Sequence, residues 1–121
     1  MKLTPLYHWS PAERYESIRL HGLRPGSEPT VASTALSYLC LGTDPRLAWA
    51  ISGAMEYVNE IEHWDLWQVH LTEGDELHVR PDFGPTIHEV NLRGCVPPDR
   101  LWWIGRRYDL GVPTPLPAKA L

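Results

Sequence analysis

The chain has 121 residues, of which 43% are hydrophobic, and this composition fits one domain with a single hydrophobic core rather than a disordered segment. The formal net charge of -4 does not favour a protein held on nucleic acid mainly by phosphate contacts. No apolar run approaches the roughly 20 residues of a membrane-spanning helix, and the N-terminal residues lack an apolar signal segment. We therefore expect a cytoplasmic protein with no membrane partner.

The first predicted element is a strand over residues 6–9 that runs directly into a helix. Ser10 is a favoured N-cap residue, Pro11 suits the first helical position, and Glu13 completes the pattern of a capping box. Gly22 is expected to end this helix, because glycine enters the left-handed region without a steric penalty. The sequence thus predicts a strand-to-helix corner at Ser10.

A loop is expected over residues 24–37, which hold two prolines, a glycine and small polar residues. A strand over residues 38–41 follows it. Asp44 as the cap and Pro45 in the first turn then indicate a second helix, which apolar residues at helical spacing carry to about residue 59.

The rest of the domain is predicted to be strands. Residues 66–71 alternate in polarity, residues 73–75 form a turn, and residues 76–79 begin the partner strand of a hairpin. Further strands are expected over residues 86–92 and 101–105.

Two early helices in a chain of short strands predict an α+β domain. We place this domain at residues 1–112 and expect a loose, proline-containing tail at residues 113–121. The two cysteines, Cys40 and Cys95, lie in apolar segments, where buried free thiols are expected, although the sequence alone leaves a disulfide open. No cluster of cysteines and histidines indicates a metal site.

Glu89 is the first candidate functional residue, because it is a carboxylate inside an otherwise apolar strand. Strand alternation places Glu89 and Asn91 on one face, and Val90 and Leu92 on the other. A buried carboxylate needs water, a partner or a function. Glu89 is therefore either a solvent-facing strand residue or a carboxylate that binds a sugar hydroxyl and stabilises an oxocarbenium-like transition state.

His8, at the end of the first strand, is the second candidate. It is either a half-buried histidine hydrogen-bonded to backbone or a ligand-binding residue beside the helix N-terminus predicted after Ser10. Thr43 and Arg46 flank the second helix start. A cation in a first helical turn is not favoured by the helix dipole, so Arg46 is either an ordinary exposed arginine or a residue that holds a pyrophosphate.

These motifs together resemble a known family. His8-Trp9-Ser10, followed by Ile18 and Gly22-Leu23, is similar to the opening of ADP-ribosyltransferases of the poly(ADP-ribose) polymerase kind. Residues 39–49 resemble the second block of that family, a strand, a polar turn and a helix with an alanine-aromatic pair. Glu89-Val90 and the segment after it resemble DarT-type toxins, which ADP-ribosylate DNA.

The resemblance implies the split β-sandwich of that family, with NAD as substrate. It implies that His8 binds ribose and the nicotinamide amide, and that Glu89 binds the nicotinamide ribose and stabilises its cation. Leu41 stands where the family has a tyrosine that stacks on nicotinamide, and Trp9 stands where it has glycine. The candidate NAD-binding residues are His8, Trp9, Ser10, Tyr38, Thr43, Arg46, Trp49 and Tyr57.

The acceptor of the ADP-ribose is open between a protein, a nucleic acid and a small molecule, and the likeness to toxins implies an inhibitor or antitoxin as a partner. Ile87 stands where arginine-modifying toxins carry Gln or Glu, which disfavours arginine as the acceptor. Two alternatives remain. One is an RNA 2′-phosphotransferase, a similar fold that needs basic residues around a phosphate, here Arg14, Arg24, Arg46 and Arg106. The other is a non-catalytic module that binds NAD or a protein.

Overall fold

The computed structural model describes residues 4–25, 38–51, 63–80 and 89–107. These residues form an α+β fold with an antiparallel sheet and two α-helices, which confirms the predicted fold class. The strands are β1 (Leu6–Pro11), β2 (Tyr38–Gly42), β3 (Trp64–Val69), β4 (Leu77–Arg80), β5 (Glu89–Arg93) and β6 (Leu101–Arg107). The helices are α1 (Tyr15–His21) and α2 (Pro45–Ile51), with 3-10 turns at Ala12–Arg14 and Pro98–Arg100.

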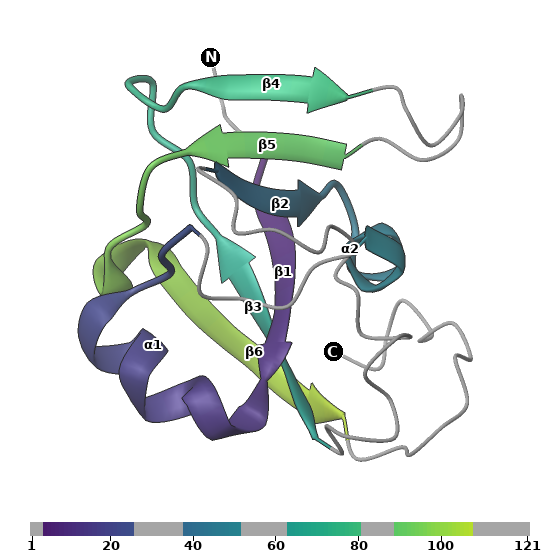
Figure 1. Ribbon diagram of the computed structural model, residues 1–121, viewed down its shortest axis with the longest axis vertical. Coiled ribbons are helices and arrows are strands. Elements are labelled where there is room, and N and C mark those ends of the chain that lie inside the picture. Colours follow the sequence, from purple (N-terminus) through teal and green to yellow (C-terminus); the bar gives the residue numbers. More distant parts are fainter. Residues whose placement is uncertain (1–3, 26–37, 52–62, 81–88, 108–121) are drawn as a thin grey trace.

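The sheet has the strand order β4-β5-β2-β1-β3-β6. Six residue pairs join β1 to β3 and five join β2 to β5, but one pair, Tyr7 with Gly42, joins β1 to β2. In Figure 1, β2, β4 and β5 lie across the molecule, whereas β1, β3 and β6 lie steeply inclined to them, with β3 antiparallel to the other two. The sheet therefore consists of two halves that meet at the Tyr7–Gly42 pair.

The predicted hairpin between residues 66–71 and 76–79 is wrong. Strand β3 pairs with β1 and β6, while β4 pairs with β5 at the opposite edge of the sheet. The connection between them crosses the sheet and is held by Arg100, whose guanidinium contacts the Asp75 carboxylate at 2.7 Å. Alternating polarity identifies a strand but does not identify its neighbour, because adjacency in sequence is only the commonest arrangement.

The predicted capping box is also wrong. Strand β1 continues through Ser10 and Pro11, which pair with Asp65 and Trp64 of β3, and α1 begins without a side-chain cap. Ser10 is fully buried, so its preference for a helix cap is outweighed by its place in the sheet. The end of α1 is as predicted.

Gly22 ends α1 with φ of 81° and a backbone hydrogen bond to Ile18. A Cβ atom at Gly22 would lie 2.0 Å from the carbonyl oxygen of Val96, so glycine is required both for its conformation and for space.

Two hydrophobic clusters lie on the two faces of the sheet. The larger cluster includes Ile18 of α1 and is completed by strand residues and the segments beside them: Leu6, Leu23, Leu39, Leu41, Trp67, Val69, Val90, Leu92, Val96 and Leu101. The smaller cluster packs α2 on the other face and contains Trp9, Ala48, Trp49, Trp64 and Leu66. The period of two in each strand divides its side chains between these clusters.

The prediction of a buried thiol is confirmed for Cys40 and is wrong for Cys95. Cys40 is buried and Cys95 is exposed, and both are free thiols. Cys95 lies outside the strands, between β5 and the 3-10 turn, so its apolar neighbours in sequence do not cover it. Neither helix in the described ranges is long and apolar enough to cross a membrane.

Several predictions fall outside the described residues. They concern most of the loop at 24–37, the second helix beyond residue 51, the first part of the strand at 86–92, Tyr57, and the tail at 113–121.

Candidate functional site

Glu89 is the first residue of β5 and its side chain is only 4% exposed. The interpretation of Glu89 as a solvent-facing residue is therefore wrong. In the register of the sheet Glu89 lies opposite Gly42, and Gly42 lies opposite Tyr7. The buried carboxylate thus belongs to the row of residues that joins the two halves of the sheet.

Gly42 lets helix α2 lie directly on this row. A Cβ atom on Gly42 would be 2.4 Å from the backbone nitrogen of Ala48, a distance that real Cβ atoms do not show. The indole of Trp9 donates a hydrogen bond of 2.9 Å to the carbonyl of Pro45 and ties the start of α2 to β1. Helix α2 is therefore fixed over the junction between β1 and β2.

His8 is buried, with 3% of its surface exposed, and its Nδ1 donates to the carbonyl oxygen of Cys40 at 3.3 Å. If the Tyr7–Gly42 register continued, Trp9 would lie opposite Cys40. Instead, the imidazole of His8 reaches that carbonyl, so it lies between β1 and β2 where regular pairing stops. This matches the interpretation of His8 as a histidine hydrogen-bonded to backbone, and it puts the ring at the junction.

His8 and Glu89 are thus separated by strand β2. Two interstrand spacings put their backbones about 10 Å apart. Alternation puts Glu89 on the same face as Tyr7 and His8 on the opposite face, with the His8 ring turned toward the edge of β2. The two side chains therefore approach the junction from opposite faces of the sheet.

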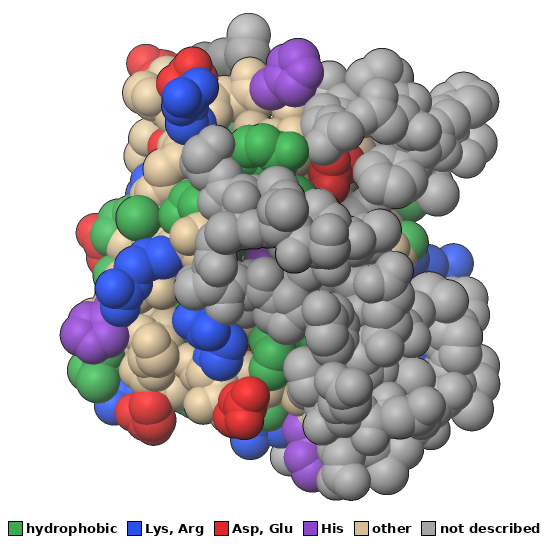
Figure 2. Space-filling view, viewed as in Figure 1, with side chains coloured by type: hydrophobic (Ala, Val, Ile, Leu, Met, Phe, Trp, Pro, Cys, Tyr) green, Lys and Arg blue, Asp and Glu red, His purple; other side chains and the backbone are tan. Residues whose placement is uncertain are grey.

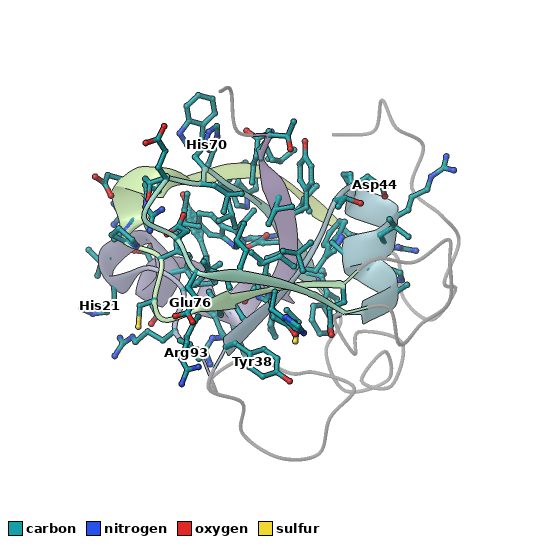
Figure 3. All side chains as sticks on the ribbon, turned by 90° about the horizontal axis from the view of Figure 1, so that it is seen from above. His21, Tyr38, Asp44, His70, Glu76 and Arg93 are labelled. Atoms are coloured by element: carbon teal, nitrogen blue, oxygen red, sulfur yellow. The ribbon has the colours of Figure 1, made fainter. Side chains whose placement is uncertain are left out.

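The aromatic candidates are not gathered at this junction. Tyr38 is at the other end of β2, opposite Arg93, about 13 Å along the strand from Gly42. Figure 3 shows Tyr38 beside Arg93, well away from Asp44 at the start of α2.

Trp49 is 8% exposed and lies edge-on against Trp9 and Trp64, with centroid distances of 5.1 and 5.8 Å. The guanidinium of Arg107 lies 4.3 Å from its ring centroid. Trp9 itself is 1% exposed and Ser10 is fully buried. In this conformation all three predicted contact residues, Trp9, Ser10 and Trp49, have their side chains in the interior.

Thr43 and Arg46 are exposed beside the junction, on either side of Asp44 and Pro45. The predicted cap is confirmed, since an Asp44 oxygen accepts the backbone N–H of Leu47 at 2.9 Å. The sequence suggested that the start of α2 could bind a pyrophosphate. The Asp44 carboxylate occupies that helix end, and its negative charge disfavours a second anion there.

Tyr7 was missed from the sequence. It lies in the same row as Glu89, and its hydroxyl accepts a hydrogen bond of 3.1 Å from Gln68. Gln68 in turn contacts His70 at 2.8 Å. The signal available in the sequence was the spacing of Tyr7 and Trp9, because residues two apart in a strand share a face.

Asp65 and Asp75 are buried or half-buried carboxylates that form ion pairs with arginines. Asp65, fully buried, accepts both Nε and a terminal nitrogen of Arg106 at 2.6 and 3.0 Å. Burial tends to raise the pKa of Asp75, but the backbone N–H of Thr72 and the guanidinium of Arg100 outweigh it, so this pKa is lowered. Both pairs hold strands and connections together rather than facing the junction.

Charged side chains on the described part of the face in Figure 2 are mixed, with Lys and Arg among Asp and Glu rather than in one basic patch. Within the described ranges, no group of three or more His, Cys, Asp or Glu side chains could hold a metal ion.

No model of a known protein family matches the sequence, and no curated protein matches it either.

Proposed function

We propose that the protein is an ADP-ribosyltransferase that uses NAD as its substrate. The observation that carries this proposal is the junction itself, where Glu89, buried in β5, and His8, buried in β1, flank the same short stretch of β2. The resemblance of the His8 and Glu89 segments to that family gives the chemistry. The single residue pair between β1 and β2 supports it, because a split sandwich requires the sheet to part there.

In the proposed reaction the bond between nicotinamide and ribose breaks, and its electron pair returns to the pyridinium nitrogen. The ribose carbon becomes cationic, and the carboxylate of Glu89 stabilises that charge while binding a ribose hydroxyl. The nucleophile of the acceptor then bonds to this carbon and loses its proton to solvent. His8 holds the ribose during both steps.

Burial favours this role for Glu89. A carboxylate that is 4% exposed interacts with developing positive charge through a medium of lower dielectric than water. A carboxylate on the surface would do so far more weakly.

Replacing Glu89 by glutamine tests the proposal. Glu89→Gln keeps the shape of the side chain but removes its charge, so nicotinamide release should fall by about 100-fold or more. The measurement is nicotinamide release from NAD by chromatography, with water as the acceptor.

The matched control is Glu76→Gln, which changes an exposed carboxylate next to β4 and should leave turnover unchanged. Circular dichroism and thermal unfolding establish that both variants fold. Full turnover in folded Glu89→Gln would show that the assignment is wrong.

A non-catalytic NAD-binding module is the second candidate, and the observation that favours it is closure of the site. His8 is 3% exposed, and Trp9 and Leu41, the departures from the family pattern, are 1% and 0% exposed. Calorimetry separates the two functions, since NAD that binds and is recovered intact indicates a module.

The position of Arg106 does not support the alternative of an RNA 2′-phosphotransferase. This residue already forms two hydrogen bonds with Asp65, so moving it to a phosphate would leave a buried carboxylate unpaired.

A further inference from the structure

Strand β6 lies at one edge of the sheet, and among the described strands it pairs with β3 alone. Edge strands in natural proteins are commonly shielded by charged residues or proline, because their outer backbone groups can pair with another strand. The stretch Leu101–Gly105 contains neither, and the side chains of Trp102 and Trp103 are 57% and 45% exposed. Strand β6 therefore has the features of an edge that accepts a further strand.

The hydrogen bonding to β3 shows which backbone groups of β6 face outward. The backbone N–H of His70 donates to the carbonyl of Arg100 at 2.9 Å, in the register of the β3–β6 ladder. Hydrogen-bonded and non-hydrogen-bonded pairs alternate along an antiparallel ladder. Trp102 therefore turns its backbone groups toward β3, whereas Leu101 and Trp103 turn theirs toward the outer edge. A bulge beyond Trp103 ends this regular stretch.

We propose that two copies of this chain associate through β6, as antiparallel strands related by a two-fold axis at Trp102. In this register Leu101 of one copy lies opposite Trp103 of the other, so the outward backbone groups of both pairs form hydrogen bonds between the copies. A two-fold axis makes one edge complementary to itself. The two Trp102 side chains then lie directly opposite each other on one face, with their Cβ atoms about 5 Å apart.

The distribution of charge favours a second copy at this edge. The chain has a net charge of -4, so two copies repel each other overall. Strand β6 contains no acidic residue, and its charged residues, Arg106 and Arg107, lie beyond the paired stretch. Arg106 forms an ion pair with Asp65, and the guanidinium of Arg107 lies over the ring of Trp49. The proposed pairing therefore places no like charges opposite each other.

The exposed tryptophans indicate how strong the association is. Trp102 packs on His70 and Trp103 stacks on Tyr15, with ring centroids 4.2 and 6.0 Å apart, so both indoles are held in place before association. At about 250 Å² for one tryptophan, their exposed parts supply up to roughly 500 Å² over two copies. Specific interfaces bury about 1,200–2,000 Å² in total. We therefore expect a weak dimer, with a dissociation constant on the order of 10 μM.

Sedimentation equilibrium of the full chain at several concentrations tests the proposal, and wild type should fit a monomer–dimer equilibrium. Trp102→Lys places two like charges opposite each other at the axis, so its dissociation constant should rise about tenfold or more. Leu77→Lys is the matched control, because Leu77 is 41% exposed on β4 at the opposite edge of the sheet. Circular dichroism establishes that both variants fold. Wild type that stays monomeric, or equal weakening in both variants, would overturn the proposal.

Cross-linking tests the position of the two-fold axis. In a Cys95→Ser background, which removes an exposed thiol, Trp102→Cys should form a disulfide-linked dimer under mild oxidation. Opposite residues of a non-hydrogen-bonded pair have Cα atoms about 4.5 Å apart, within the range of a disulfide. Trp103→Cys should not cross-link, because its two copies lie diagonally, about 7–8 Å apart. Cross-linking of Trp103→Cys in preference to Trp102→Cys would contradict the proposed register.

Discussion

Gly42 shows how one residue can position a whole site. It lies between Tyr7 and Glu89 in the register, and it has no side chain to keep helix α2 away from the sheet. Because the backbone nitrogen of Ala48 would be 2.4 Å from a Cβ atom at this position, any other residue must push α2 outward. The glycine is required for space and not for backbone conformation, since its φ is not positive.

We predict that Gly42→Ala destabilises the protein by about 1–3 kcal/mol, the usual cost of overpacking a well-packed interior. It should also lower NAD turnover more than stability alone explains, because α2 moves relative to Glu89. Urea unfolding and nicotinamide release provide the two measurements.

Gly105→Ala is the control for this change. Gly105 is also a strand glycine, but a Cβ atom there meets nothing within 4 Å. Equal losses of stability in the two variants would show that the contact with Ala48 is not the cause.

At the scale of elements, the connection from β3 to β4 is anchored by an ion pair between Asp75 and Arg100. It carries the chain from one half of the sheet to the other, and Asp75 anchors it by accepting the Thr72 N–H and the Arg100 guanidinium, both at 2.7 Å. The side chains of Asp75 and Arg100 are 11% and 19% exposed, so solvent screens this pair less than a surface pair.

The lowered pKa of Asp75 gives this pair a pH dependence. A carboxyl whose pKa is lower in the folded state stabilises the fold at pH values above its unfolded pKa, about 3.8. That contribution is lost as the pH falls below 3.8 through the folded pKa. We expect Asp75→Asn to cost about 1–3 kcal/mol at neutral pH.

The difference between wild type and Asp75→Asn should shrink as the pH is lowered through this range. Urea unfolding at several pH values measures it, and Glu16→Gln serves as the control because its pair with Arg19 is exposed. A difference that stays constant down to the lowest pH would show that the charge of Asp75 does not contribute.

At the scale of the whole molecule, the sheet consists of two halves, β4-β5-β2 and β1-β3-β6. Helix α1 packs on one face and α2 on the other, and the halves meet at the Tyr7–Gly42 pair (Figure 1). Few ladder hydrogen bonds therefore hold β1 to β2, and we expect local opening there to cost less than opening between β1 and β3.

We predict that backbone amides on the β1–β2 boundary exchange with deuterium faster than those between β1 and β3. Saturating NAD should slow exchange at that boundary, because a ligand at 100 times its dissociation constant adds about 2.7 kcal/mol to the stability of the state that binds it. Hydrogen exchange followed by NMR tests both points. Protection by NAD elsewhere, with none at this boundary, would contradict the location of the site.

Local signals in the sequence predicted much of this protein. Alternation predicted the two faces of β5, the Asp44-Pro45 sequence predicted the start of α2, and Gly22 predicted the end of α1. Each of these features depends only on residues that are close together in the sequence. The prediction of Ser10 as a helix N-cap was wrong because it also used only local sequence. The local preference of Ser10 for a helix cap is worth about 1 kcal/mol. The pairing of β1 with β3, which buries the neighbouring apolar residues Trp9 and Pro11, outweighs that preference.

Contacts between distant segments could be decided only by the tertiary structure. Three features join residues far apart in the chain: the pairing of β4 with β5 rather than β3, the packing of Trp49 of α2 on Trp9 and Trp64, and the hydrogen bond from His8 to Cys40. Side-chain type and spacing set which residues can be buried, but packing of the whole chain determines what each one meets there.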